Sequence, residues 1–274
     1  MKLPATALLL LLFAPAAQAQ AHLADSLPVI SLQKDFEDTR RFSPAPQIRW
    51  VRTSNAGLLG ELDEAALQQA VRGKNVLVLI HGMGTSFAWT MHYYRRLLHR
   101  DLPYDMIVGV VWPGGEVKNS RLANGLLFLQ AGARAKKAGK KLAPLLAALS
   151  ASADTLDVLT HSLGAKTGLF SLKHGPANNI DNLFLTAPAI SARSLLPHKR
   201  YGFAAGRVRG KIAVFYSRND RAFAFPAKRK MGRRGFVGAA RQPGEKFINV
   251  DCSEKVLSHM DYWRSRAVSQ FLER

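Results

Sequence analysis

Short apolar runs that alternate with longer helical patterns constrain this chain most, because they decide which parts of the backbone can be buried together. Several runs are nearly unbroken stretches of Val, Ile and Leu, which is typical of strands covered on both faces. We predict strands at residues 47–52, 76–80, 106–112, 156–160, 183–186, 212–216 and 247–250.

Helical patterns fill the intervals, at residues 63–71, 85–100, 122–149, 165–173 and 261–272. Alternation of strand and helix implies a single α/β domain with a mainly parallel sheet, right-handed crossovers and helices on both faces. The stretch 118–149 contains Gly125, Gly132, Gly139 and Pro144, so we expect its helix to break. Reactive groups in such a sheet gather at the carboxyl ends of the strands.

The first nineteen residues, MKLPATALLLLLFAPAAQA, have the basic, apolar and small-residue regions of a secretory signal. We expect export to the periplasm or medium with cleavage after Ala19, a second acceptable site after Ala21, and a retained anchor as the alternative. Residues 20–45 are then expected to be a lead-in segment and 46–274 the α/β domain. The single cysteine, Cys252, cannot form an intramolecular disulfide, so the core alone must stabilise the domain.

The formal charge of +20 is unevenly distributed, and removal of residues 1–19 would leave +19. No Asp or Glu occurs between Val117 and Ala153, and Asp220 is the only acid between Asn182 and Gly244. One reading is a solvated basic face that keeps the protein soluble. The other is a specific anionic partner, such as a membrane surface. Nucleic acid is not expected, because no known binding module is present.

The segment VLTHSLGAK places Ser162 between a predicted strand and a predicted helix. A sharp turn of this kind exposes its middle side chain at a helix N-terminus, which suits an acyl-transfer nucleophile. Thr160 stands where the usual motif G-x-S-x-G has glycine, and its branched Cβ adds bulk where the backbones approach. Ser162 is therefore a candidate nucleophile, with a helix N-cap as the alternative reading.

A nucleophilic serine needs a base and an acid, which in this topology follow in the order Ser, Asp, His. Asp220 follows the strand 212–216, and His259 lies beyond the last strand. Asp251 is a second choice for the acid, because it comes directly after the strand 247–250. A turn residue at Asp220 and a packing role for His259 remain the alternatives.

The sequence His81-Gly82-Met83-Gly84 follows a buried strand, and its glycines permit a turn that presents N–H groups to a developing negative charge. The expected oxyanion donors are the backbone amides of Met83 and Leu163. Trp112 is a candidate for lining an acyl pocket or for the core.

Four motifs in order, IHGMG, THSLGA, SRNDRA and SHMDYW, resemble those of the α/β-hydrolase superfamily and span residues 80–263. IHGMGTSF, VVWPGG and THSLGA together resemble bacterial hydrolases assigned to domain-of-unknown-function families. The resemblance implies an α/β-hydrolase fold with Ser162 as nucleophile, His259 as base and Asp220 as acid. It also implies Met83 and Leu163 as oxyanion donors.

These observations predict an exported serine hydrolase that cleaves small-molecule or lipid carboxylic esters without a metal or organic cofactor. The chain shows no large cap insertion, so we expect an open site. The alternative is a hydrolase-fold protein that Thr160 has disabled and that binds anionic lipid or polymer through its basic face. A lipase that docks on an anionic membrane combines both readings.

Overall fold

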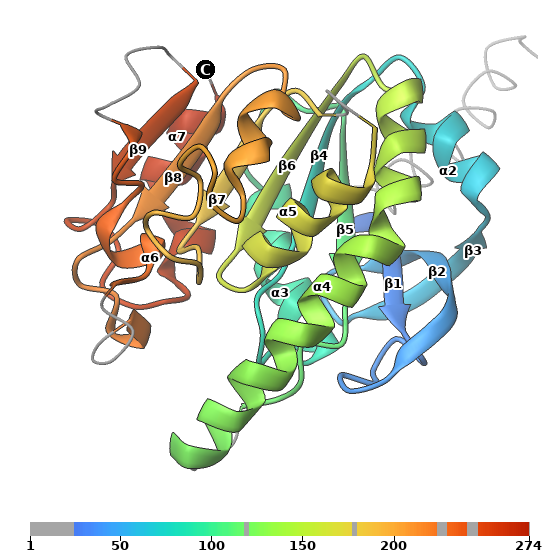
Figure 1. Ribbon diagram of the computed structural model, residues 1–274. Coiled ribbons are helices and arrows are strands. Elements are labelled where there is room, and N and C mark those ends of the chain that lie inside the picture. The colour runs from blue at the N-terminus through green and yellow to red at the C-terminus, as the bar shows by residue number, and fades with distance from the viewer. Residues whose placement is uncertain (1–24, 118–120, 177–179, 224–228, 240–245, 274) are drawn as a thin grey trace, which may run out of the picture.

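The structure is a computed structural model that describes residues 25–117, 121–176, 180–223, 229–239 and 246–273. Its centre is a nine-stranded sheet in the order β3-β2-β1-β5-β4-β6-β7-β8-β9. Seven strands, β1 and β4 to β9, run parallel, and β2 and β3 form an antiparallel edge. This confirms the mainly parallel sheet predicted from the sequence (Figure 1).

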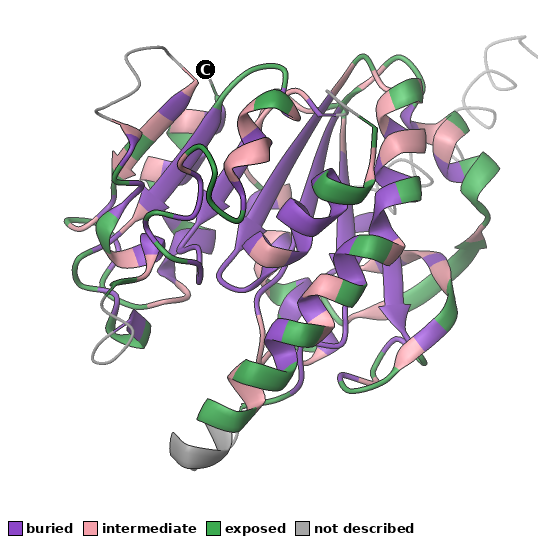
Figure 2. Ribbon diagram, viewed as in Figure 1, coloured by how far each residue is buried: buried purple, intermediate pink, exposed green. Residues whose placement is uncertain are grey.

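The predicted strands of the central and C-terminal sheet are all present. They are β4 (Asn75–Ile80), β5 (Met106–Val111), β6 (Thr155–His161), β7 (Leu183–Thr186), β8 (Ile212–Tyr216) and β9 (Phe247–Asp251). Their apolar side chains are almost wholly buried in β4, β5 and β6, as continuous Val/Ile/Leu runs require. Figure 2 shows these strands as the buried centre of the molecule.

Two strands, β1 (Ser26–Gln33) and β3 (Gly57–Leu62), were not predicted. A third, β2 (Phe42–Arg52), begins before the predicted start at residue 47. β1 is buried along its whole length between β2 and β5, so part of the expected lead-in segment belongs to the sheet. Pro44 and Pro46 fall where the β1–β2 register shifts, which is where a strand tolerates residues without an N–H.

Helices cover both faces of the sheet (Figure 1). One layer holds α2 (Glu64–Val71), α4 (Arg121–Ser152), α5 (Gly164–His174) and the short α6 (Met231–Arg234). The other holds α3 (Phe87–Leu98), the 3₁₀ turn η6 (Asp261–Arg264) and α7 (Arg266–Leu272). Further 3₁₀ turns lie at Gly202–Gly206 and Arg221–Phe223. In the part of the chain described here, no connection between strands builds a separate cap domain.

The expectation that the helix between β5 and β6 breaks is wrong, because α4 is a single helix of 32 residues. Gly139 allows α4 to pack against α5: a Cβ there would stand 2.5 Å from the Thr167 carbonyl oxygen and from the Phe170 Cβ. Pro144 lies on the exposed side together with Lys140, whose carbonyl can therefore be hydrated instead of accepting the missing N–H.

Among the described helices, none combines the length and the apolar character that crossing a bilayer requires. The expected signal sequence, residues 1–19, lies outside the described residues.

Candidate active site

Ser162 occupies a sharp turn between β6 and α5, near the middle of the parallel sheet. Its φ of +53° is in the left-handed region, which non-glycine residues adopt at a cost and mainly where the surroundings hold them. The Ser162 N–H donates to the Thr186 carbonyl at 2.9 Å, and the Ser162 carbonyl accepts from Ala189 at 3.0 Å. A Cβ at Gly164 would lie 2.4 Å from the His81 carbonyl oxygen. The turn is thus held by neighbouring strand ends.

Thr160 fits beside this turn because the facing helix carries a glycine. The Thr160 side chain is fully buried, and its Cγ2 would lie 2.9 Å from a Cβ added at Gly168 on α5. Its Oγ1 donates weakly to the Phe184 carbonyl at 3.4 Å. The space that the usual motif obtains from glycine at position 160 is therefore provided by Gly168, and the turn forms with threonine in place.

The three side chains predicted as nucleophile, base and acid form one hydrogen-bonded chain. His259 Nε2 lies 2.8 Å from Ser162 Oγ, and His259 Nδ1 lies 2.7 Å from Asp220 Oδ2. Ser162 and Asp220 are buried, whereas the His259 side chain is 22% exposed. Because the Asp220 carboxylate accepts the Nδ1–H proton, Nε2 is left free to accept the proton of the serine hydroxyl.

Asp251, the second choice for the acid, lies in a different set of interactions. Its carboxylate pairs with Arg218 at 2.7 Å and accepts from the Tyr216 hydroxyl at 3.0 Å. It makes no hydrogen bond with His259 among the described residues. The structure therefore brings Asp220, and not Asp251, to the imidazole.

Three further side chains hold His259 in place and were not identified from the sequence. The buried His161 ring lies 4.7 Å from the His259 ring between centroids, and His161 Nε2 lies 2.8 Å from the His259 carbonyl oxygen. Burial lowers the pKa of His161 far below its ordinary value, so this ring is neutral and donates through Nε2. Phe223 packs edge-on against His259 at 5.1 Å, and Asp261 accepts the N–H groups of Leu257 and Ser258.

The two expected oxyanion donors lie in turns that pack against each other. A Cβ at Gly82 would stand 2.9 Å from the Ser162 Cβ and 3.3 Å from the His161 carbonyl oxygen. No hydrogen bond within the described residues uses the backbone N–H of Met83 or of Leu163. Both amides thus lie beside the serine turn with their donor capacity unused.

His81 fixes the direction of one of these amides. Its Nε2 accepts from the backbone N–H of Trp112 at 3.1 Å, so the ring proton is on Nδ1. This Nδ1 lies 2.5 Å from the Gly82 carbonyl oxygen. Burial lowers the pKa of His81 to about 4, which keeps the ring neutral. The C=O and N–H of a trans peptide point in opposite directions, so holding the Gly82 carbonyl also orients the Met83 N–H. Trp112 is fully buried and supports this turn, as a core residue would.

Among the described residues, no group of three or more His, Cys, Asp or Glu side chains is arranged to hold a metal ion. The arrangement can polarise a serine hydroxyl and offers backbone N–H groups beside it. These are the requirements for acyl transfer at a carbonyl group.

Comparison with known proteins places most of the chain in one family. Residues 74–273 match the family described as "Protein of unknown function (DUF726)". No curated protein matches significantly. The chain is similar to solved structures of esterase 2 of Thermogutta terrifontis, at 15% identity and a TM-score of 0.40, covering 74% of this chain and 81% of that one. It is also similar to an esterase of Pyrobaculum calidifontis, at 12% identity and a TM-score of 0.47, covering 96% and 88%.

Proposed function

The chain belongs to the DUF726 family of proteins of unknown function, and we propose that it is a serine hydrolase that cleaves carboxylic esters. The observation that carries this proposal is the pair of short hydrogen bonds that joins Ser162 through His259 to Asp220. A helix N-cap, the alternative reading of the serine, would direct the hydroxyl to a backbone N–H of α5, whereas Ser162 Oγ lies 2.8 Å from an imidazole nitrogen.

In the first half of the reaction Ser162 Oγ attacks the ester carbonyl while His259 Nε2 takes its proton. Asp220 keeps the imidazole in the required tautomer and stabilises the imidazolium. The tetrahedral oxyanion accepts hydrogen bonds from the Met83 and Leu163 amides. His259 then gives the proton to the leaving alcohol, and an acyl group remains on Ser162.

In the second half a water molecule replaces the alcohol. His259 Nε2 takes a proton from this water, whose oxygen attacks the acyl carbon, and the same amides stabilise the second oxyanion. Return of the proton to Ser162 Oγ releases the carboxylic acid. No metal or organic cofactor takes part in this proposed sequence.

The alternative of a disabled hydrolase rests on the bulk of Thr160. The contact between Thr160 and Gly168 argues against it, because the serine turn is formed with threonine in place. The basic surface remains available for a second role, such as docking on an anionic membrane.

The proposal is tested by hydrolysis of p-nitrophenyl esters of increasing acyl length by wild type, Ser162→Ala and a control, Ser150→Ala, near the far end of α4. We expect Ser162→Ala to lose at least about 10³-fold in rate and Ser150→Ala to keep the wild-type rate. Wild-type turnover by Ser162→Ala on every ester would refute the assignment.

We also propose that this reaction takes place outside the cytoplasm, because residues 1–19 have the pattern of a secretory signal. N-terminal sequencing of protein from the periplasmic or secreted fraction should begin at Gln20 or, for the second site, at His22. Full-length protein that stays in the cytoplasmic fraction would contradict this placement.

A further inference from the structure

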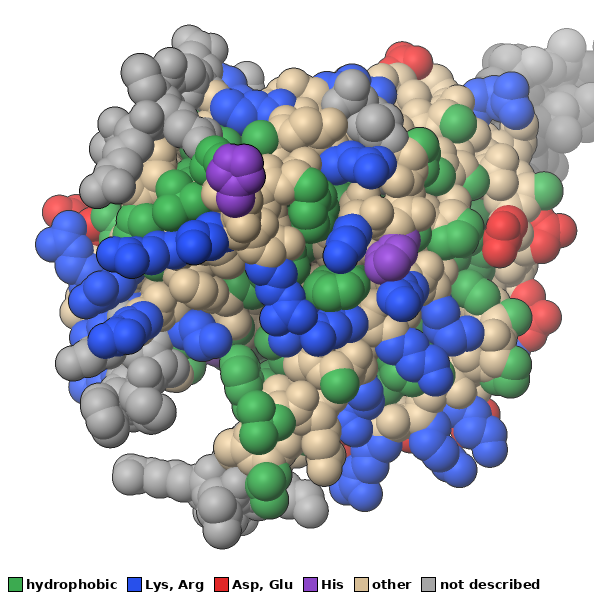
Figure 3. All heavy atoms as spheres, viewed as in Figure 1, with side chains coloured by type: hydrophobic (Ala, Val, Ile, Leu, Met, Phe, Trp, Pro, Cys, Tyr) green, Lys and Arg blue, Asp and Glu red, His purple; other side chains and the backbone are tan. Residues whose placement is uncertain are grey.

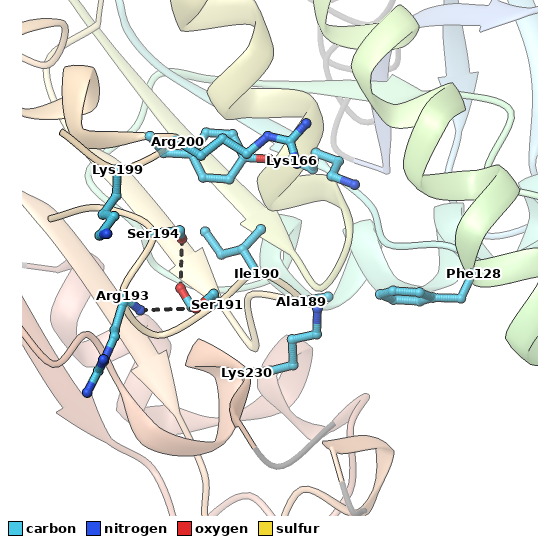
Figure 4. A pocket seen from close by; sticks show the side chains of 11 residues that line it. Phe128, Lys166, Ala189, Ile190, Ser191, Arg193, Ser194, Lys199, Arg200 and Lys230 are labelled. Atoms are coloured by element: carbon cyan, nitrogen blue, oxygen red, sulfur yellow. Dashed lines mark hydrogen bonds between the residues drawn. The ribbon is translucent and has the colours of Figure 1, made fainter. Parts of the chain in front are cut away.

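A cavity of about 490 Å³ lies against α5, the helix that begins directly after the serine turn, and is lined by several positively charged side chains. It lies between α4, α5 and the segment that follows β7. Figure 4 shows Lys166 and Arg200 on one side, Lys230 on the other, and Phe128 reaching in from α4. On the same face of the molecule, Lys and Arg side chains gather over the middle, whereas Asp and Glu are visible near the margins (Figure 3).

The cavity is connected to the serine turn through the backbone. Ala189, which lines the cavity, donates its N–H to the Ser162 carbonyl at 3.0 Å. Lys166 lies in the first turn of α5, which begins at Gly164 directly after the serine turn. A group bound at Lys166 and a carbonyl at Ser162 can therefore belong to one small molecule.

The cations that line the cavity have no carboxylate partner in the part of the chain that the structure describes. Lys166, Arg200 and Lys230 form no ion pair with Asp or Glu among the described residues. The sequence explains this, because the only acid between Asn182 and Gly244 is Asp220, which is bonded to His259. Lys230 instead lies 5.3 Å from the centroid of the Phe128 ring.

Mutual repulsion among these cations raises the free energy of the folded protein, and a bound anion would lower it. The pKa of Lys166 is lowered to about 8, first by burial and then by the charges of Lys136, Arg200 and Lys230. Burial also lowers the pKa of Lys230. A further uncompensated group is the buried hydroxyl of Tyr201, which has no hydrogen-bond partner among the described residues although Tyr201 lines the cavity.

We propose that this cavity binds the phosphate group of the ester that Ser162 cleaves. A phosphate monoester carries about two negative charges at neutral pH, which suits several converging cations better than a carboxylate does. The lining also includes the apolar side chains of Phe128, Ala189 and Ile190, which can hold the carbon chain of the same molecule. The substrate class is thus an acyl ester that also carries phosphate. The cleavage part of this statement rests on the function proposed above, and the binding part does not.

The binding part is tested by titrating inorganic phosphate and glycerol 3-phosphate at fixed pH and ionic strength. Wild type and Ser162→Ala should each show one saturable site for glycerol 3-phosphate. Lys166→Gln and Lys230→Gln should weaken it at least about tenfold, because each removes a charge-assisted hydrogen bond. The control, Lys211→Gln, removes the same charge from an exposed residue directly before β8, at the opposite edge of the sheet, and should bind as wild type does.

Two binding results would overturn the proposal: no saturable site, or equal weakening by Lys211→Gln and the cavity variants. Tighter binding of inorganic phosphate than of glycerol 3-phosphate would indicate a site for the free ion and would also overturn it. Thermal unfolding of each variant identifies misfolding. Lys166→Gln should be at least as stable as wild type, because the replaced ammonium is partly buried among cations.

The substrate part is tested by comparing an acylglycerol phosphate with the monoacylglycerol of the same acyl chain. Wild type should prefer the phosphorylated ester in kcat/KM at least about tenfold. Lys166→Gln and Lys230→Gln should lose this preference, and Lys211→Gln should keep it. An equal preference in all four proteins would overturn the substrate assignment. If neither wild type nor Ser162→Ala hydrolyses any ester, the proposed function fails, while the phosphate titration still decides whether the cavity binds phosphate.

Discussion

The fit between Thr160 and Gly168 predicts a specific coupling between these residues. Gly168→Ala places a methyl group 2.9 Å from Thr160 Cγ2, closer than carbon atoms pack. Overpacking of this kind costs about 1–3 kcal/mol, against which alanine gains about 1 kcal/mol of helix propensity. We expect a net loss of about 1 kcal/mol in the free energy of unfolding. Thr160→Ser deletes the opposing buried methyl and should also cost about 1 kcal/mol.

The double variant moves one methyl group from the strand to the helix and keeps the hydroxyl of residue 160. Its free energy of unfolding should be close to that of wild type, about 2 kcal/mol above the sum of the single changes. Urea unfolding followed by circular dichroism measures all four proteins. Ester hydrolysis should fall in Gly168→Ala and recover in the double variant, because Ser162 lies between the two elements. Additivity within about 0.5 kcal/mol would refute the compensation.

Three further predictions concern the site and its surroundings. Asp220→Asn should lower kcat by roughly 10³–10⁴-fold, because the amide does not hold the required imidazole tautomer. Asp251→Asn should leave kcat unchanged. Steady-state kinetics of the two variants measures this difference. Gly82→Ala should reduce kcat and fluorophosphonate labelling, since its methyl would stand 2.9 Å from the Ser162 Cβ; an unchanged rate would contradict the packed turns. Lys166→Gln should raise Tm most at or below pH 8. The pKa of Lys166 in the folded protein is about 8, below its ordinary value of 10.5, so the protonated side chain lowers the stability of the fold. This loss of stability decreases as the pH rises from about 8 to 10.5. A difference in Tm between Lys166→Gln and wild type that does not change with pH would contradict this.

The three residues of the hydrogen-bonded chain at Ser162 could be predicted from the sequence, because each follows a recognisable strand and the three occur in a fixed order along the chain. The prediction of Ser162, Asp220 and His259 required only the positions of three strand ends and the order Ser, Asp, His. The sequence placed Asp220 first and left Asp251 as a second choice, because both follow strands at the same edge of the sheet, and the structure then showed that Asp220 is the acid hydrogen-bonded to His259. His81 and His161 act through ring orientation and through contacts between distant segments, which no local pattern encodes.

The fold was predictable where strands are continuous apolar runs, but not in β1 and the start of β2, which contain prolines, or in β3, a mostly exposed edge strand with two glycines. β1 contains Pro28, and β5 pairs with β1 only from Val29 onward, so this proline precedes that ladder. The glycines of α4 predicted a break, but Gly139 faces α5 and Gly132 lies against the Lys166 ammonium. A glycine can break a helix or can allow another segment to pack closely against it. Which of the two happens depends on the tertiary contacts of that glycine, and these cannot be read from the local sequence.

The central claim, that Ser162 is a nucleophile activated by His259 and Asp220, is tested most directly by covalent labelling. A fluorophosphonate should add one phosphonyl group to wild type, and mass spectrometry of the peptides should locate it on Ser162. Ser162→Ala should remain unlabelled, and His259→Ala should react far more slowly, because the base that accepts the serine proton is absent. Equal labelling of wild type and Ser162→Ala, or a phosphonyl group on another residue, would contradict the claim.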